Sequence, residues 1–478
     1  MRGRLRARSW RSPFGIAGVS SSQRQGTTVP RKYFIETFGC QMNVHDSERL
    51  AGLLDQAGYE AAAAPNEADL VVINTCSVRE RAEDRLYTEL GQVPENTSGR
   101  RPIVAVTGCV AQQEGSALLQ RGRRVDLVVG TQALTRLPKM VDELEQSRPE
   151  RVDINPYDNV SFPFGITKRT DPVKASVTII EGCNDFCAFC VVPYTRGHER
   201  MRPSREIVEE VRLAASQGHR EIQLLGQIVN HYAAPDRPDC DFAALLELVN
   251  EVPGVERIRF ASPHPRHVTA RMLGVMQRLP KVCRHLHLPV QSGSTEVLTR
   301  MRRRHSREDY LTLVERIRTA MPDIALSTDM IVGFPGETAR DFEETLSLVR
   351  TVGYHSMFSF KYSERPNTLA TQRFPDDVAA ADKTSRIVEL QDVQKGIQEK
   401  LHRRQVGREV EVLVDSTSRR RQSELAGRTA GNTVVNFKAP ESLLGQLVRV
   451  RITEAGPFSL RGQLARAPQP HGGTHHAG

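Results

Sequence analysis

Three cysteines near the middle of the chain have the spacing of a soft-metal site. Cys183, Cys187 and Cys190 form a C-x3-C-x2-C pattern. They follow a β-branched run, 177–180, which predicts a buried strand that breaks at Gly182. Three thiolates in one loop suit a compact iron–sulfur centre, and a cube of four irons held by them would keep one iron without a protein ligand. That iron would be open to a substrate or cofactor.

Spacing alone leaves two other uses of these cysteines open. Zinc would require a fourth ligand, and His198 lies eight residues after Cys190. A disulfide would leave one of the three cysteines over, which is unusual inside a cell. The pattern favours an iron–sulfur cluster over both alternatives.

Three more cysteines each follow a predicted strand in the N-terminal third. The strands are 33–38, 70–74 and 103–107, and they lead to Cys40, Cys76 and Cys109. Alternating strands and helices imply a parallel sheet, whose strands share one carboxyl edge. The three cysteines could therefore converge as ligands although they are far apart in the sequence. The helix after the first strand is predicted to have Asp46 or Ser47 as its N-cap.

The region from about 169 to 402 predicts the scaffold that holds the central cysteines. The expected strands are 177–180, 221–225, 257–261, 285–290, 325–331 and 357–362, and the expected helices are 204–216, 241–250, 307–320, 337–352 and 381–403. Six strand–helix units fit an open (β/α)6 barrel, with its chemistry at the carboxyl ends of the strands. Gln291, Asp329 and Gly333 fall at those ends, where polar groups and glycine can meet a ligand. A plain turn is the alternative for Gly333.

The C-terminal part changes to short β-rich segments and predicts a small barrel. Its expected strands are 409–415, 433–437, 447–452 and 460–464. It is rich in arginine, at Arg403, Arg404, Arg408, Arg419, Arg420, Arg421 and Arg428. A barrel edged with arginine is suited to RNA backbone, although arginine runs are often merely solvated.

The bulk composition is that of a globular chain with room for two to four domains. Among 478 residues, Lys and Arg number 66 against 57 Asp and Glu, and the net charge of +9 permits a polyanionic partner without requiring one. No apolar run approaches the roughly 18 residues of a membrane span, so we expect no membrane partner. Eight cysteines in a chain of this length favour metal or redox chemistry over a disulfide scaffold.

Both ends of the chain predict disorder. Residues 1–31 are expected to be a basic extension, with arginines at Arg2, Arg4, Arg6, Arg8, Arg11 and Arg24 and no acid before Glu36. An organellar transit peptide is the minor alternative. No secretory apolar segment is present, so a cytoplasmic location is expected. Residues 468–478 are expected to be a disordered tail.

The segments around the six cysteines resemble the radical S-adenosylmethionine (SAM) methylthiotransferases that modify tRNA. They are VTIIEGCNDFCAFCVVPYTRG, TFGCQMNVHDSE, INTCSVRERA and TGCVAQQEG, and the resemblance runs from about residue 32 to 466. It implies a mixed α/β fold in three parts. These are an N-terminal parallel-sheet domain over 32–148, a radical SAM partial barrel over 169–402 and an OB-like β-barrel of the TRAM type over 403–467.

The resemblance also implies the cofactors. One 4Fe–4S cluster would lie on Cys183, Cys187 and Cys190 and bind SAM, and an auxiliary 4Fe–4S cluster would lie on Cys40, Cys76 and Cys109. The first would reduce SAM to a 5′-deoxyadenosyl radical, the second would present sulfur, and a second SAM would donate the methyl group. The segments LHLPVQSGS and STDMIVGFPGET imply that Gln291, Asp329 and Gly333 lie near SAM. No side chain is expected to act as a catalytic acid or base.

The motifs look most like the branch that acts on isopentenyladenosine beside the anticodon. The alternatives are the branch for threonylcarbamoyladenosine, the relative that modifies an aspartate of a ribosomal protein, and a non-enzymatic RNA-binding iron–sulfur protein. The implied partners are the anticodon stem-loop of tRNA, an external one-electron reductant, and sulfur and cluster assembly proteins, and the chain is expected to be a monomer.

Four residues stand outside the family pattern or the ligand spacing. Ile228 and Asn367 replace an asparagine and a glycine that are common in the family. Cys240 and Cys283 have no cysteine neighbour at ligand spacing and are expected not to be ligands.

Overall fold

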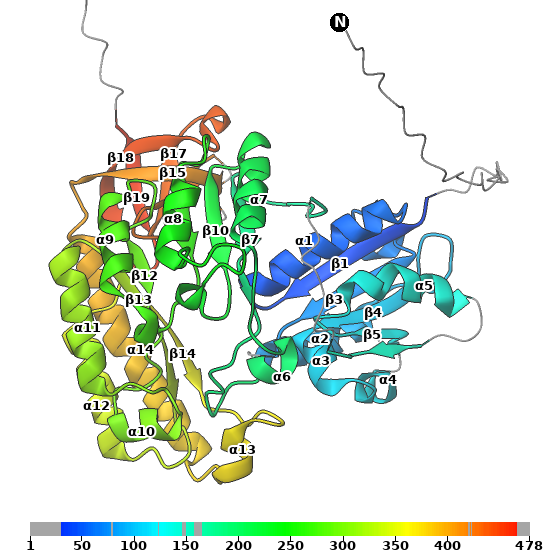
Figure 1. Cartoon of the computed structure of the whole chain (residues 1–478), viewed down its shortest axis with the longest axis horizontal. Coiled ribbons are helices and arrows are strands. Elements are labelled where there is room, and N and C mark those ends of the chain that lie inside the picture. Colours follow the sequence, from blue (N-terminus) through cyan, green and yellow to red (C-terminus); the bar gives the residue numbers. More distant parts are fainter. Residues whose placement is uncertain are drawn as a thin grey trace, which may run out of the picture.

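The computed structural model describes residues 30–77, 80–122, 124–145, 150–156, 165–418, 421 and 423–465. The predictions for residues 1–29, for Arg419 and Arg420, and for the tail 468–478 lie outside these ranges. Three parts follow one another along the chain, and Figure 1 shows them as a blue and cyan α/β sheet, a green and yellow barrel, and a small red barrel. Within the described ranges, no helix has the length and apolar character to cross a membrane.

The N-terminal part is a parallel sheet of six strands in the order β2-β1-β3-β4-β5-β6. The strands are β1 Lys32–Phe38, β2 Glu60–Ala61, β3 Leu70–Thr75, β4 Ile103–Gly108, β5 Leu127–Val129 and β6 Val152–Asp153. Phe38 pairs with Thr75, and Thr75 pairs with Gly108. The three strands that lead to cysteines therefore end side by side, as the parallel-sheet prediction required.

Among the described residues of this part, five helices cover the two faces of the sheet. They are α1 Gln41–Gln56, α2 Glu80–Gln92, α3 Cys109–Glu114, α4 Ala117–Arg121 and α5 Leu137–Glu145. Apolar residues of α1 and α5 pack on one face, and those of α2, α3 and α4 pack on the other. Alternate residues of β3 serve the two cores, because successive side chains of a strand point to opposite faces.

The predicted N-cap of α1 was wrong. The helix begins at Gln41 with Cys40 at the N-cap position, and both Asp46 and Ser47 lie inside it and are buried. Their polar groups serve other contacts: the Asp46 carboxylate binds Arg196, and the Ser47 hydroxyl lies 2.7 Å from that of Thr37.

The central part is the predicted open barrel of six parallel strands. They are β7 Lys174–Thr178, β10 Glu221–Leu225, β11 Arg257–Phe260, β12 His285–His287, β13 Ala325–Val332 and β14 Ser356–Lys361. The order is β7-β10-β11 and β12-β13-β14, and a bridge from Ile258 to Val282 joins the two groups. The first strand ends two residues earlier than predicted, and a separate antiparallel pair, β8 Ile180–Glu181 with β9 Arg200–Met201, frames the cysteine loop.

Helices cover the outside of this barrel. The larger ones are α7 Ser204–Ser216, α8 Phe242–Asn250, α9 Ala270–Arg278, α11 Arg307–Ala320, α12 Ala339–Val352 and α14 Ala380–Arg403, and the shorter ones are α6 Val192–Arg196, α10 Thr295–Arg300 and α13 Leu369–Arg373. A capping box of Thr338 and Asp341 starts α12, two residues later than predicted. Glu337 is outside the helix because its carboxylate binds elsewhere, as described below.

The C-terminal part is a closed five-stranded barrel in the order β15-β16-β17-β19-β18. Its strands are β15 Glu409–Thr417, β16 Leu425–Thr429, β17 Val434–Lys438, β18 Leu447–Ala455 and β19 Leu460–Leu464. Four of the five were predicted from the sequence. Val412, Val414, Phe437, Val450 and Ile452 are among the side chains that fill its core.

The C-terminal barrel sits on the amino ends of the central strands. Arg259 of β11 donates to the carbonyl oxygens of Thr429 at 2.7 Å and Ala430 at 3.1 Å, and its Nε donates to the Glu221 carboxylate at 2.9 Å. Lys174, the first residue of β7, pairs with Asp415 at 2.6 Å. The C-terminal barrel and the cysteine loop therefore lie at opposite ends of the central barrel (Figure 1).

Replacing Arg259 with Ala should destabilise this junction. The change leaves the Glu221 carboxylate, which is 1% exposed, without its cation and removes two hydrogen bonds to the C-terminal barrel. Loss of one partner of a buried ion pair costs about 3–5 kcal/mol. We expect a lower urea midpoint and faster proteolysis near residue 405. Arg451→Ala, which removes an exposed partner of Glu409, should change stability by less than about 1 kcal/mol. Equal losses of stability in the two variants would contradict the role of Arg259 as a buried link between the two barrels.

Candidate active site

The three N-terminal cysteines meet at the carboxyl edge of the sheet. Cys40 caps α1, Cys76 follows β3 directly, and Cys109 is the first residue of α3. Gly39 has a φ of 131°, and a Cβ there would overlap the Cβ of Cys76. The close approach of the two cysteine segments therefore requires glycine at position 39.

Two buried asparagines fix the position of Cys40 relative to β3. Asn43 Nδ2 donates to Asn74 Oδ1 at 3.0 Å, and Asn74 Nδ2 donates to the Asn43 carbonyl oxygen at 2.9 Å and to Ser47 Oγ at 2.9 Å. The Cys40 thiol donates to Asn43 Oδ1 at 3.2 Å. Both asparagines are fully buried, so this pairing holds the first turn of α1 against the sheet.

The electrostatic environment gives the thiols of this group different pKa values. A hydrogen bond from Cys76 is the largest cause that lowers the pKa of Cys40 to about 6, and the charge of Arg196 and the N–H groups of Asn43 and Met42 act in the same direction against burial. Burial raises the pKa of Cys109, although Arg196 again acts to lower it.

Cys183, Cys187 and Cys190 lie on one loop at the carboxyl end of β7. The loop closes on itself, because the N–H of Cys183 donates to the Gly197 carbonyl at 3.1 Å and that of Cys190 donates to the Cys187 carbonyl at 3.0 Å. Gly182 has a φ of 77°, and a Cβ there would overlap the carbonyl of His198. Burial raises the pKa of Cys183 and of Cys190 to about 12.

The barrel holds this loop from its far side. The N–H of Ala188 donates to the Met301 carbonyl at 2.9 Å, and Ala370 donates to the Ala188 carbonyl at 2.8 Å. Arg303 Nη1 lies 3.5 Å from Cys187 Sγ, and its Nη2 donates to the Pro289 carbonyl at 2.7 Å. Sequence reasoning missed Arg303, because it follows α10 and has no motif of its own.

The chemistry of both donor sets fits iron–sulfur clusters. Each set offers three thiols, and none of the eight cysteines forms a disulfide. Thiolates are the ligands that soft iron centres prefer, and a bound metal ion deprotonates a coordinating thiol. His198, the possible zinc ligand, lies with its Nδ1 3.3 Å from Asn184 Oδ1. Within the described ranges, no three His, Cys, Asp or Glu side chains are grouped closely enough for a single metal ion.

The three residues expected near SAM gather along β13. Gln291 has a φ of 80°, and its N–H donates to the Asp329 carbonyl at 3.0 Å. The Asp329 carboxylate lies 3.4 Å from His287 Nε2, and His287 Nδ1 lies 2.9 Å from Ser327 Oγ. The ring of Phe358 on β14 lies 6.2 Å from that of His287 and is 54% exposed. This side of the barrel thus offers both polar groups and an aromatic surface.

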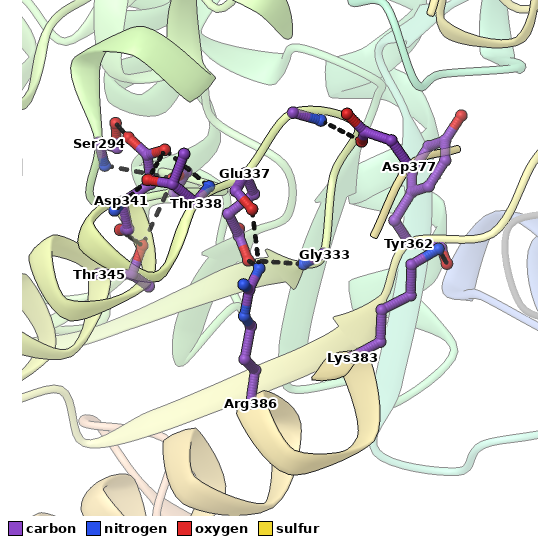
Figure 2. Close-up of polar contacts among 12 residues, drawn as sticks. Ser294, Gly333, Glu337, Thr338, Asp341, Thr345, Tyr362, Asp377, Lys383 and Arg386 are labelled. Atoms are coloured by element: carbon purple, nitrogen blue, oxygen red, sulfur yellow. Dashed lines mark hydrogen bonds and ion pairs between the residues drawn. The ribbon is translucent and has the colours of Figure 1, made fainter. Parts of the chain in front are cut away.

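Gly333 directly follows β13 in a loop that α14 packs against. Its N–H donates to Glu337 Oε1 at 2.8 Å, and the same oxygen accepts from Arg386 Nη1 at 2.7 Å (Figure 2). With a φ of 70°, Gly333 also leaves room for the Lys383 side chain, which a Cβ would overlap. Glu337 Oε2 is buried and has no hydrogen-bond partner among the described residues. Glu337 therefore holds the loop through Oε1, and the hydrogen-bonding capacity of Oε2 is not used by the described residues.

A buried charge network joins the two cysteine groups. The short helix α6 starts two residues after Cys190 and packs against α3. Arg196 Nη2 lies 2.6 Å from the Asp46 carboxylate, and both side chains are buried. Beside this pair, Arg49 binds the Glu181 carboxylate at 2.9 Å. Sequence reasoning missed the contact between Arg196 and Asp46. The two residues lie on different domains, and the family motifs around them do not indicate that they pair.

The residues outside the family pattern are accommodated by the fold. Ile228 is 5% exposed in the loop after β10. Asn367 has a φ of 65°, a region that glycine favours and asparagine tolerates. Cys240 and Cys283 are buried, and burial raises the pKa of both thiols.

Comparisons with known proteins place this architecture in a class. Family models match residues 32–130 (Uncharacterized protein family UPF0004), 177–349 (Radical SAM superfamily) and 403–465 (TRAM domain). The structure is similar to that of the radical S-adenosylmethionine methyltransferase TsrM from Kitasatospora setae, with a TM-score of 0.53 and 14% identity over 72% of this chain and 77% of that one. Fold and domains thus define a radical SAM protein with a TRAM barrel.

Relatives that align along nearly the whole chain give the particular family. The chain is 44% identical, over 92% of its length and all of the relative, to the tRNA-2-methylthio-N(6)-dimethylallyladenosine synthase of Thiobacillus denitrificans. It is 42% identical, over 91% of its length, to that of Neisseria gonorrhoeae and 44% identical, over 91%, to that of Chromobacterium violaceum. The chain belongs to the tRNA-2-methylthio-N(6)-dimethylallyladenosine synthase family.

The difference in thiol pKa predicts selective alkylation of the metal-free protein. A pKa of about 6 makes Cys40 mostly thiolate at pH 7, whereas Cys183 and Cys190, at about 12, stay protonated. Because the thiolate is the nucleophile, iodoacetamide should modify Cys40 first, and its rate should rise as the pH increases through 6. Peptide mass spectrometry measures the order. Equal rates for Cys40 and Cys183 at pH 7 would contradict the environment described here.

Proposed function

We propose that this chain transfers a methylthio group to carbon 2 of isopentenyladenosine next to the anticodon of tRNA, with SAM as both radical source and methyl donor. The observation that carries the proposal is that both cysteine groups lie at one domain interface, joined by α6, in a chain that aligns over 92% of its length with an enzyme of this name. Those relatives do not favour the threonylcarbamoyl, ribosomal-protein or non-enzymatic alternatives.

The reaction explains why the site has cysteines instead of an acid–base pair. Carbon 2 of adenine carries no acidic proton, so no side chain can activate it at neutral pH. When bound, the clusters and SAM supply electron transfer, sulfur and the methyl group. The chain's own residues hold and shield these groups: Cys183, Cys187 and Cys190 would bind the SAM-side cluster, and Cys40, Cys76 and Cys109 the auxiliary cluster.

Gln291, Asp329 and Gly333 are proposed to shape the SAM side of the barrel. The positive φ of Gln291 directs its backbone onto β13, and the Asp329 carboxylate is held beside His287. Gly333 keeps the loop close to α14, where Glu337 has a buried oxygen to offer a ligand. In this arrangement Asp329 and Glu337 supply hydrogen-bond acceptors, and the missing side chain of Gly333 leaves space for Lys383.

The position of the TRAM barrel supports a proposal for the course of tRNA along the molecule. The barrel sits at the amino end of β13, where Gly431 lies against Ala325, and the cysteine loop lies at the carboxyl end of the central barrel. Eight residues of strand separate the two ends by about 25 Å. tRNA held by exposed Arg404 and Arg408 must therefore extend past the central barrel for its base to reach the clusters. Anticodon-loop bases are already unstacked, which lowers the energy of entering a pocket.

Several further partners belong to the proposal. Reductive cleavage of SAM consumes electrons, so an external one-electron reductant is required. Sulfur given up to the product must be replaced, which calls for sulfur and cluster assembly proteins. We infer a monomer that works in the cytoplasm, where bacterial tRNA is modified, and domain boundaries at 32–148, 169–402 and 403–467.

Replacing each group of cysteines separately tests the function. We expect about eight irons per wild-type chain, as two cubes require, and about four in either the Cys40/Cys76/Cys109→Ser or the Cys183/Cys187/Cys190→Ser variant. In a deletion strain, the wild-type gene should restore 2-methylthio-isopentenyladenosine in tRNA and neither variant should. Cys240→Ser, a buried cysteine outside both groups, is the matched control and should keep iron and activity. An unchanged nucleoside profile in the deletion strain, or zinc at either group, would reject the proposal.

A further inference from the structure

We propose that Arg196 is a positioning residue of the auxiliary site, whose buried positive charge stabilises the anionic cluster on Cys40, Cys76 and Cys109. This inference rests on the proposed function, because it assumes that these cysteines hold a cluster. On this proposal, the segment that binds the SAM-side cluster also supplies a positive charge to the auxiliary cluster.

The backbone carries Arg196 out of the central barrel and into the N-terminal domain. Arg196 is the last residue of α6, and its carbonyl oxygen accepts from Gln132 Nε2 at 3.0 Å. The preceding carbonyl, of Thr195, accepts from Thr131 Oγ1 at 2.5 Å. Gly197 then turns the chain back with a φ of 74°, where a Cβ would overlap Gln132 Nε2. The N-terminal domain thus binds the last two residues of α6 through hydrogen bonds to their carbonyl oxygens.

Asp46 fixes the guanidinium group of Arg196 beside the cysteines. Asp46 is 1% exposed and lies on α1, the helix whose N-cap is Cys40. Its carboxylate is 2.6 Å from Arg196 Nη2, and Arg196 itself is 5% exposed. Six residues of helix are less than two turns, so the ion pair lies close to the first turn of α1. The ion pair with Asp46 therefore holds the Arg196 guanidinium group in one orientation near the first turn of α1.

The helix that ends in Arg196, α6, also packs against α3, the helix whose first residue is Cys109. A guanidinium group at this place favours sulfur that carries negative charge. A cube with three thiolate ligands is an anion, and an anion buried away from water requires a compensating charge. Hydrogen bonds to the sulfurs and nearby charge also set the reduction potential of such a cluster.

The alternative is that Arg196 only holds two domains together. In that case its charge would affect both clusters equally, or neither, and any residue that keeps the domains in contact would serve. Arg200 offers a control cation, because it binds Glu181 at 3.3 Å within the β8–β9 ribbon, and Glu181 in turn binds Arg49 of the N-terminal domain. Glu181 lies two residues before Cys183 and on the SAM-side loop.

The test measures the reduction potentials of the two clusters in Arg196→Gln, Arg196→Lys and Arg200→Gln. Anaerobic redox titrations followed by electron paramagnetic resonance, with iron counts, need no tRNA. We expect Arg196→Gln to shift the auxiliary cluster to a lower potential, or to lose that cluster alone, while the SAM-side cluster keeps its potential. Arg196→Lys should restore the auxiliary potential in part, and Arg200→Gln should leave both potentials unchanged.

A second readout connects the charge to the reaction. Arg196→Gln should release several-fold more 5′-deoxyadenosine per methylthiolated nucleoside than the wild type, because SAM cleavage continues while sulfur transfer is impaired. An unchanged auxiliary potential in folded Arg196→Gln with all its iron, an equal shift of both clusters, or loss of the auxiliary cluster from Arg196→Lys as well as Arg196→Gln would overturn the inference. Failure of the proposed function would look different, since the wild type itself would then make no methylthiolated product.

Discussion

The buried ion pair between Arg196 and Asp46 fixes how the two halves of the active site face each other. Taking two charges out of water costs several kcal/mol for each ion, and only a short, well-oriented contact offsets this. The contact at 2.6 Å meets that condition, and Arg49 with Glu181 repeats the arrangement beside it. The interface therefore has one favourable arrangement, and that arrangement brings the SAM-side cysteine loop against α1, which Cys40 caps, and α3, which begins at Cys109.

A long helix joins the carboxyl end of the central barrel to the TRAM barrel. The helix α14 runs 24 residues, about 36 Å, along the outside of the central barrel (Figure 1). Near its start, Lys383 and Arg386 pack against the loop of Gly333 and Glu337, and near its end His402 Nδ1 lies 2.7 Å from the Gly456 carbonyl of the TRAM barrel. One helix thus connects the loop of Gly333 and Glu337 with the TRAM barrel.

The sequence predicted the parts of this site that have a local signal. β-branched runs such as 70–74 are buried on both faces and are typical of parallel strands, and the shared carboxyl edge of such a sheet then brings Cys40, Cys76 and Cys109 together. The start of α1 was missed because a cysteine N-cap has no side-chain oxygen, so the capping rule favoured Asp46 instead. β16 was missed because LAGRT has no alternation and forms only when the barrel closes around it.

Long-range polar contacts could not be predicted in the same way. Asp46 and Arg196 are polar residues 150 positions apart, and nothing in either segment indicates that both are buried. Their burial follows from the packing of α6 on α3, and α6 is a five-residue helix with no periodic pattern. A pattern in one sequence reports which residues face a core, whereas the pairing of two buried charges depends on how complete domains meet.

The distance between the two clusters tests the central claim most directly. Pulsed electron paramagnetic resonance on the doubly reduced enzyme measures the spin–spin interaction between them. A rigid interface predicts one narrow distance distribution, which should broaden when Asp46 is replaced by Ala. A broad distribution in the wild type, or one that Asp46→Ala leaves unchanged, would contradict the account.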